Sequence, residues 1–335
     1  MNKRIEAFGW LGQYLEQLPP ADWRDPTARA IKQNPWFDHI SIRIAVEAIS
    51  QNLKTTLLEQ WLSPYKMKDN DSRLIGVIMA GNIPLVGFND FLCVLATGHR
   101  IAVKLSTQDN VLLPIIAGFL TKQFPGFKEY ITFEDSIKQA NAVIATGSDN
   151  SARYFSYYFK EIPYIIRKNR SSIAILDGGE SKENIAALGD DVFTYFGLGC
   201  RNVSKLLLPK GCDIKKLMVV WKDHEAVLKH QKYARNYRFQ KAVMSMNNQE
   251  YYDNGFILLT NKEDVIAPIS VLNYQYYEHQ EDLVKKVELH QHKTQCIVSQ
   301  AGWYPGSIAF GQAQYPRLWD YADQVDTVQF LTDLT

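Results

Sequence analysis

The sequence predicts an α/β protein built on a parallel sheet. Short, nearly continuous apolar runs, of the kind found in strands covered on both faces, alternate with helical patterns. The first runs are 73–80, 100–104 and 141–146, and helical patterns at 87–97 and 111–124 lie between them. Strands that alternate with helices of this length imply crossover helices, which connect parallel strands.

The rest of the chain continues this alternation. Further strands are expected at 164–167, 172–176, 203–208, 255–259, 270–276 and 295–299, and further helices at 184–196, 214–230 and 278–289. Residues 1–68 predict helices only, and the tail at 310–323 is irregular and aromatic. No internal repeat or low-complexity linker marks a domain border in the sequence. We place the border near residue 189, which gives domains 1–188 and 189–335.

Composition excludes several classes of protein. Hydrophobic residues make up 46% of the 335 residues, which excludes a largely disordered chain. Lys and Arg total 37 against 36 for Asp and Glu, a net charge of +1 with both signs interleaved, so a nucleic-acid partner is not expected. The four cysteines are widely spaced and form no C-x-x-C pair, which disfavours zinc, iron–sulfur and disulfide frameworks and fits a reducing compartment.

The sequence shows no sign of export or membrane insertion. The first residues lack the apolar run of a signal peptide. No window approaches the roughly 18 apolar residues that a membrane helix needs. We therefore expect a cytoplasmic protein.

A single cysteine stands in an unusual context. Cys200 follows Gly197-Leu198-Gly199, between the helix expected at 184–196 and the strand expected at 203–208. Glycines around a side chain indicate that the backbone is closely approached, and an accessible thiol can act as a nucleophile. The alternative is a packed cysteine in a tight helix-to-strand turn.

Polar residues follow three of the expected strands, where parallel sheets bind their ligands. They are Asn82, Lys104 with Ser106, and Thr146-Gly147-Ser148. Lys104 and Ser106 could bind ribose hydroxyls or a 2′-phosphate, and residues 146–148 could offer backbone N–H groups to a pyrophosphate. A solvated lysine and a helix-capping serine are the alternatives. Neither G-x-G-x-x-G nor a P-loop is present.

The combination of these motifs resembles the aldehyde dehydrogenase superfamily. The matching segments are Gly81-Asn82-Ile83-Pro84-Leu85, Val94-Leu95-Ala96-Thr97-Gly98, Val103-Lys104-Leu105-Ser106, Ile144-Ala145-Thr146-Gly147-Ser148 and Gly197-Leu198-Gly199-Cys200. The tail, which reads Gly-Gln-Ala-Gln-x-Pro-x-Leu-Trp-Asp-Tyr-Ala-Asp from residue 311, resembles long-chain acyl-CoA reductases of the bacterial luminescence type. The resemblance covers residues 70–330 approximately.

The resemblance implies a fold and a reaction. The fold would be aldehyde-dehydrogenase-like, with a parallel-sheet nucleotide-binding domain (1–188) and a smaller α/β catalytic domain (189–335). Cys200 would be the nucleophile, and Asn82 with the Cys200 N–H would stabilise the oxyanion. The substrate would be acyl-CoA or an acyl-carrier thioester, the cofactor NADPH with NADH possible, and the state a homo-oligomer.

Two departures from the family pattern bear on the reaction. The stretch 167–175, where hydrolytic members carry a glutamate, has no carboxylate, as suits an enzyme that does not release an acid. Asp264 stands where the family has a glutamate that orients the nicotinamide ribose, and it is shorter by one methylene. A thiol-to-thiol acyl transferase using Cys200 and a non-catalytic nucleotide-binding partner remain as alternatives.

Overall fold

The computed structural model describes residues 2–67 and 72–334, whose Cα positions separate into two compact units. Unit 1 comprises Met1–Asn169 and Arg317–Thr335, and unit 2 comprises Arg170–Pro316. The border expected from the sequence, between residues 188 and 189, falls inside a helix of unit 2. The tail at 310–323, expected in the second domain, is divided between the units: residues 310–316 belong to unit 2, and the chain from Arg317 onward belongs to unit 1.

Unit 1 begins with helices, as the sequence predicts, although residues 1 and 68 of the predicted segment lie outside the described residues. The helices are α1 (Asn2–Glu16), α2 (Pro20–Gln33), α3 (His39–Asn52) and α4 (Thr55–Leu62). Asp38 caps α3 by accepting a hydrogen bond from the Ser41 N–H at 2.7 Å. The apolar faces of these helices carry fully buried side chains such as Phe8 and Leu11, so they form part of the core.

A five-stranded parallel sheet follows. Its strands are β1 (Leu74–Ile78), β2 (Arg100–Lys104), β3 (Ile131–Phe133), β4 (Ala142–Thr146) and β5 (Tyr164–Arg167), in the order β3-β2-β1-β4-β5. The connecting helices are α5 (Phe88–Ala96), α6 (Leu112–Gln123) and α7 (Asp149–Tyr158). The short edge strand β3 was missed by the sequence analysis.

The centre of this sheet is a topological switch point. Val77 of β1 pairs with Val103 of β2 on one side and with Ile144 of β4 on the other. The chain moves outward from β1 to β2 and β3, then returns to place β4 on the opposite side of β1. In open parallel sheets this is the position where ligands bind, beyond the carboxyl ends of the strands.

The chain from Arg317 onward completes the core of unit 1. It includes α12 (Thr327–Thr332), in which Val328 and Leu331 are fully buried. The buried Arg167 at the end of β5 donates to Asp90 of α5 at 2.6 Å and to Thr327 at 3.0 Å, which ties the tail to the sheet and its crossover helix.

Unit 2 holds a seven-stranded sheet in the order β12-β11-β6-β7-β10-β9-β8, parallel except for edge strand β8. The strands are β6 (Ser171–Ile175), β7 (Val203–Pro209), β8 (Tyr252–Asp253), β9 (Leu258–Asn261), β10 (Val271–Tyr277), β11 (Thr294–Ser299) and β12 (Ile308–Ala309). The helices are α8 (Lys182–Phe193), α9 (Ile214–Val220), α10 (Gln231–Met246) and α11 (Gln280–His290).

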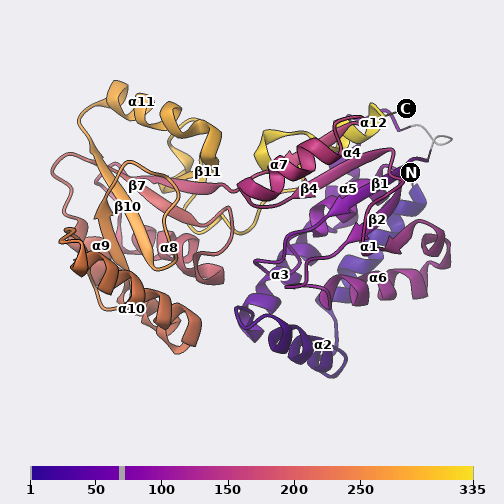
Figure 1. The fold of residues 1–335 in the computed structure, drawn as a ribbon, viewed down its shortest axis with the longest axis horizontal. Helices are drawn as coiled ribbons and strands as arrows, with labels where there is room; N and C mark the ends of the chain where they lie inside the picture. Colours follow the sequence, from indigo (N-terminus) through magenta and orange to yellow (C-terminus); the bar gives the residue numbers. More distant parts are fainter. Residues whose placement is uncertain (1, 68–71, 335) are drawn as a thin grey trace. The chain divides into compact units, whose positions relative to one another are not determined.

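Helices cover both faces of this second sheet (Figure 1). Ile173 and Ile175 of β6 pack toward α11, whereas Ala174 and Leu176 pack with residues of α8 and α9. This two-residue alternation explains why the strands read as continuous apolar runs.

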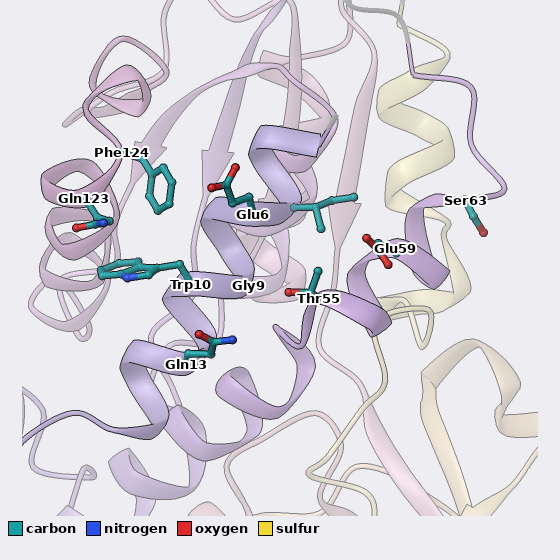
Figure 2. Close-up of a pocket in the computed structure, with 10 residues that line it drawn as sticks. Glu6, Gly9, Trp10, Gln13, Thr55, Glu59, Ser63, Gln123 and Phe124 are labelled. Atoms are coloured by element: carbon teal, nitrogen blue, oxygen red, sulfur yellow. The ribbon is translucent and has the colours of Figure 1, made fainter.

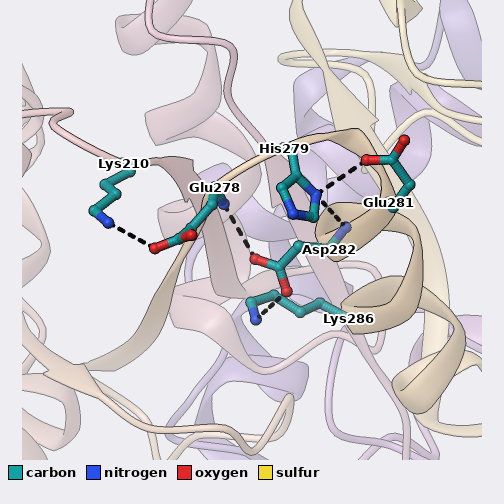
Figure 3. A network of polar contacts seen from close by, with 6 residues as sticks. All are labelled: Lys210, Glu278, His279, Glu281, Asp282 and Lys286. Carbon is teal, nitrogen blue, oxygen red and sulfur yellow. Dashed lines mark hydrogen bonds and ion pairs between the residues drawn. The ribbon is translucent and has the colours of Figure 1, made fainter.

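Two parts of unit 2 differ from the sequence expectation. The helix expected at 214–230 is α9 followed by 3₁₀ turns at Trp221–Lys229, and α10 was not expected. Helix α11 begins as expected, at an exposed polar network (Figure 3). There His279 accepts from the Asp282 N–H at 3.2 Å, and Asp282 pairs with Lys286 at 2.8 Å.

Candidate active site

The turn that carries Cys200 is strained. Helix α8 ends at Phe193, and the next residues include three with positive φ: Tyr195 at 53°, Phe196 at 58° and Gly197 at 77°. Left-handed backbone costs a non-glycine residue on the order of 1–3 kcal/mol, and such strain gathers at functional sites. The strain therefore marks this turn as a place where the surrounding structure imposes the backbone conformation.

The side chain of Asn202 holds the turn together. Its Oδ1 accepts a hydrogen bond from the Gly199 N–H at 2.8 Å, and its Nδ2 donates to the carbonyls of Asp191 at 3.0 Å and Thr194 at 2.8 Å. The residue is only 1% exposed. Because the last carbonyls of a helix lack partners within it, the amide caps α8 and closes the Cys200 turn at once.

Cys200 itself is partly exposed, whereas Cys93 is fully buried. The carbonyl of Cys200 accepts from the hydroxyl of Ser172 at 3.2 Å, and that hydroxyl also lies 3.1 Å from the Sγ of Cys296. Ser172 lies in the stretch 167–175, which contains no carboxylate. A hydroxyl, not a carboxylate, thus reaches the Cys200 turn from this stretch.

A second set of bonds ties the turn to the segment 311–313. The buried carboxylate of Asp191 accepts from the N–H groups of Gly311 at 2.7 Å and Ala313 at 2.9 Å, and Arg201 donates from Nε to the Ala313 carbonyl at 2.5 Å. Burial raises the pKa of Asp191 to about 7, against the lowering effect of the two N–H donors. The residues on both sides of Cys200 in this turn are therefore anchored to buried groups.

In unit 1, the turns after β1 and β2 pack directly on each other. A Cβ at Gly81 would lie 2.7 Å from the Ser106 hydroxyl, so only glycine fits. The Gly81 carbonyl accepts from the buried Asn34 amide at 3.1 Å. These contacts fix the backbone from which Asn82, a partly exposed residue, projects.

Asp109 stabilises the same turn from the other side. Its carboxylate accepts from the N–H of Leu85, a non-glycine residue with a φ of 58°. Burial raises the pKa of Asp109 to about 6. The Asn82 turn is thus held at both ends by polar groups from elsewhere in the chain.

The remaining predicted cofactor residues of unit 1 lie at the carboxyl ends of β2 and β4. Ser148 caps α7 by accepting from the Ser151 N–H at 3.2 Å, so the capping role considered from the sequence is present. Lys104 donates from Nζ to the Asp135 carbonyl at 2.5 Å. Thr146 ends β4, and Gly147 follows it before the start of α7. The first sheet therefore brings Asn82, Ser106 and the 146–148 turn to one edge at its switch point.

Asp264 is exposed in unit 2, on a segment whose backbone carbonyls accept hydrogen bonds from side chains. The fully buried Lys205 donates from Nζ to the carbonyls of Lys262 and Glu263, the latter at 3.1 Å. Asn273 donates to the Asp264 carbonyl at 2.9 Å, and Ser204 donates to that of Val265. Burial lowers the pKa of Lys205 to about 8. Side chains near the start of β7 and β10 thus hold four consecutive carbonyls.

Several of these residues escaped the sequence analysis. They are Asn34, Asp109, Asp191, Asn202 and Lys205. A lysine inside an apolar strand pattern was a readable signal for Lys205, since an uncompensated charge there is costly. The others are ordinary polar residues whose partners are backbone groups, which leave no mark in the sequence.

Three further observations concern a pocket, metal ligands and membrane spans. A pocket of about 820 Å³ in unit 1 is lined by residues of α1, α4 and α6, including Glu6, Trp10 and Glu59, and by none of the predicted site residues (Figure 2). Within 2–67 and 72–334, no group of His, Cys, Asp or Glu is arranged to hold a metal ion. Across the same ranges, no helix combines the length and apolarity needed to cross a membrane.

The architecture is similar to that of several solved aldehyde dehydrogenases. A putative aldehyde dehydrogenase from Burkholderia cenocepacia aligns with a TM-score of 0.66 and 11% identity over 88% of this chain and 73% of its own. An enzyme from Bacillus cereus, solved with NAD⁺, aligns at 0.64 and 13% over 89% and 71%. Aldehyde dehydrogenase C from Pseudomonas syringae, a mutant solved with NAD⁺ and octanal, aligns at 0.63 and 10% over 89% and 72%.

The chain has the aldehyde dehydrogenase fold. The fold class expected from the sequence, an aldehyde-dehydrogenase-like α/β fold with a parallel sheet and a second, smaller α/β domain, is therefore confirmed. No protein-family model and no curated protein sequence matches the chain. The assignment to the acyl-CoA reductase branch stays a prediction from the sequence motifs.

Proposed function

We propose that this chain reduces an acyl thioester to the aldehyde with NADPH, through a thioester formed on Cys200. The observation that carries the proposal is the strained turn that presents a partly exposed Cys200 in a protein with the aldehyde dehydrogenase fold. A packed structural cysteine needs neither the left-handed residues before it nor the buried amide that closes the turn.

The residues around Cys200 support reduction rather than hydrolysis. Ser172 contributes a hydroxyl to the Cys200 carbonyl, from the stretch where the resemblance places a water-activating glutamate. The carboxylate of Asp191 is already bound by two backbone N–H groups. Because the stretch 167–175 offers no carboxylate to activate water, an acyl group on Cys200 would persist until a hydride or another thiol removes it.

The strand ends of unit 1 fit a nicotinamide dinucleotide. Gly147 brings the backbone against α7, since a Cβ there would lie 2.8 Å from the Ser151 Cβ, and the turn opens onto the α7 N-terminus, where phosphate groups are favoured. Thr146, Ser148 and Ser106 would contact the cofactor, and Lys104 would release the Asp135 carbonyl to bind a ribose hydroxyl or a 2′-phosphate. Asp264 would orient the nicotinamide ribose. NADPH is favoured by the resemblance, with NADH as the alternative.

The reaction follows from the roles of these groups. The Cys200 thiolate attacks the acyl carbonyl, the CoA or carrier thiolate leaves, and a new thioester remains on Sγ. NADPH, when bound, supplies the hydride that reduces this carbonyl. The resulting thiohemiacetal oxyanion expels the Cys200 thiolate and becomes the aldehyde. Both tetrahedral oxyanions would be stabilised by the Asn82 amide and the Cys200 N–H, and one such donor is typically worth about 10²–10³ in rate.

The substrate would be a fatty acyl thioester. The tail motif at 311–323 supports this choice, and the structural neighbour from Pseudomonas syringae was solved with octanal, an aliphatic aldehyde. We also propose a cytoplasmic homo-oligomer, on the resemblance and the cysteine usage.

The test is a two-stage experiment. The chain is incubated with radiolabelled long-chain acyl-CoA, label on Cys200 is located by peptide mapping, and NADPH is then added while aldehyde is measured. We expect label on Cys200 that is lost as aldehyde appears. Cys200→Ser should abolish both signals, and Cys212→Ser, which alters a thiol before α9, should retain both.

The alternatives give different results. Label that stays until a second thiol is added, with no aldehyde, would support the transferase. No label at all would support a non-catalytic partner. Aldehyde formation by the Cys200→Ser variant would refute the nucleophile.

A further inference from the structure

The side-chain amide of Asn202 links the Cys200 turn to the end of α8. Its amide satisfies one N–H in the turn itself and carbonyls at the end of α8, and these groups lie from three to eleven residues away from it in the sequence. It also donates weakly to the Val192 carbonyl at 3.4 Å. The side-chain amide therefore joins the end of α8 to the turn through hydrogen bonds that are not part of a helix or a sheet.

The turn needs this support because its backbone is unfavourable. Tyr195 and Phe196 adopt left-handed φ values, and both are buried. Such conformations persist only where neighbouring interactions impose them. The backbone contributes two bonds within the same turn, from the Leu198 N–H to the Tyr195 carbonyl at 3.1 Å and from the Asn202 N–H to the Gly199 carbonyl at 3.0 Å. Removing the amide would leave these backbone bonds to oppose the strain.

A second anchor acts on the residue that follows Cys200. Arg201 donates to the Ala313 carbonyl, and Asp191 holds the N–H groups of Gly311 and Ala313. The carbonyl of Asp191 is one of those bound by Asn202. The turn, the end of α8 and the segment 311–313 are thus one connected polar network, with Asn202 in its middle.

We propose that Asn202 is a positioning residue, which holds the 195–202 turn in the conformation that aims the Sγ and N–H of Cys200 at one acyl carbonyl. In acyl transfer, the Cys200 Sγ must reach the carbonyl carbon while the Cys200 N–H donates to the oxygen of the same carbonyl. A loosened turn therefore lowers the rate even when the thiol stays accessible. The catalytic part of this inference rests on the proposed function, whereas the structural part does not.

The test compares Asn202→Ala and Asn202→Asp with the control Asn236→Ala. Asn236 is a suitable control because its amide bonds only one turn away within α10, to the Lys232 carbonyl. Acylation of Cys200 by acyl-CoA is expected to fall roughly 100-fold in Asn202→Ala, the usual cost of a misplaced reacting group. The apparent KM for acyl-CoA should change little.

Alkylation by iodoacetamide separates positioning from loss of the fold. This small reagent needs no aligned oxyanion donor, so Cys200 should react within about threefold of the wild-type rate. The amides of β10, which pairs with β7 and β9 inside the sheet of unit 2, should keep their wild-type hydrogen exchange. If their exchange quickens in parallel with the loss of acylation, Asn202 is merely structural and the proposal is wrong.

The aspartate variant adds a pH signature. The new carboxylate would keep the acceptor for Gly199 but would face carbonyl oxygens, whereas its protonated form can donate one hydrogen bond. The acylation rate relative to wild type should therefore recover as the pH is lowered. An unchanged ratio across the pH range would count against the proposal.

Hydrogen exchange tests the inference without any activity. Amides of the 195–203 peptide should exchange faster in both Asn202 variants and at the wild-type rate in Asn236→Ala. If the wild type shows no acylation while the turn loosens as expected, the proposed function fails and the holding role of Asn202 stands. Unchanged exchange in both variants would overturn the inference.

Discussion

Asp191 shows how burial and hydrogen bonding compete at one residue. The side chain is 1% exposed, and its ionised form gains two backbone donors but loses its hydration. Burial is the larger effect, and it brings the pKa to about 7. This carboxyl therefore gains and loses its proton close to neutral pH. It lies next to the turn that carries Cys200.

The first prediction concerns stability against pH. The folded pKa of Asp191 lies above the ordinary value of about 4, so the folded chain binds this proton more tightly than the unfolded chain. Its contribution to the free energy of unfolding is complete below about pH 4 and is lost as the pH rises through about 7. Asp191→Asn, which cannot ionise, should flatten this part of the curve in urea unfolding at a series of pH values.

The neighbouring residue supplies the control for Asp191. Asp190 is exposed on the same helix, and its charge raises the pKa of Asp191 less than burial does, so Asp190→Asn should leave most of the slope between about pH 4 and 7 in place. An equal flattening in both variants would show that general charge, and not the buried carboxyl, sets the slope.

At the scale of an element, the segment 262–265 depends on side chains and not on regular hydrogen bonding. The Lys205 Nζ donates hydrogen bonds to the carbonyls of Lys262 and Glu263. The side chain of Asn273, the register partner of Lys205 on β10, donates to the Asp264 carbonyl. A segment fixed in this way can hold an exposed carboxylate such as that of Asp264 at a constant position.

Replacing Lys205 should uncouple the two halves of the proposed reaction. Lys205→Met keeps the length of the side chain but leaves two carbonyls without their donor, which costs on the order of 1–3 kcal/mol each where such groups are buried. We expect the KM for NADPH to rise roughly tenfold as Asp264 loses its position, about 1.4 kcal/mol of binding. Acylation of Cys200 in the absence of NADPH should be nearly unchanged.

The matched control for this variant is Lys210→Met. Lys210 follows β7 and pairs with Glu278 at 2.6 Å on the exposed surface, where an ion pair contributes little (Figure 3). Its KM for NADPH should equal that of wild type. A loss of acylation as large as the loss of NADPH affinity in Lys205→Met would contradict the separate role given to this segment.

The elements differ in how readily the sequence reveals them. Strands β2 and β5 were predicted at their observed bounds, because buried parallel strands are continuous apolar runs between turn residues. Helix α10 was missed because only Tyr233, Tyr237 and Met244 among its residues are buried, too few to give a periodic apolar face.

The candidate site could be proposed from the sequence to a similar, partial extent. Cys200 was singled out because glycines precede it, and the strand-end residues of unit 1 were singled out because each follows an apolar run. The amide of Asn202 could not be recognised, since its partners are carbonyl groups that every residue carries. Strand order was equally hidden, because the pairing of β1 with β4 depends on tertiary packing.

On the scale of the whole molecule, the chain returns to unit 1 after completing unit 2. Tyr321 of the tail accepts from the Trp61 indole at 2.7 Å and lies 2.8 Å from the Tyr65 hydroxyl. These partners are about 260 positions apart in the sequence, which is why the tail read only as irregular and aromatic. Unit 1 and unit 2 have separate apolar cores, and the chain from Arg317 onward contributes to the first.

The last prediction tests this division. Thr327 is fully buried at the start of α12, where it accepts from Arg167, so Thr327→Val removes a charge-assisted hydrogen bond while keeping the shape of the side chain. The loss should be about 1.5–3 kcal/mol, and hydrogen exchange should quicken in α12 and α5, which pack together. Thr332→Val, at a partly exposed position of the same helix, should have little effect. Because the core of unit 2 shares no residue with that of unit 1, the amides of β7 and β10 should keep their protection in both variants. Equal loss of protection in the two sheets would mean that the chain unfolds as a single cooperative unit.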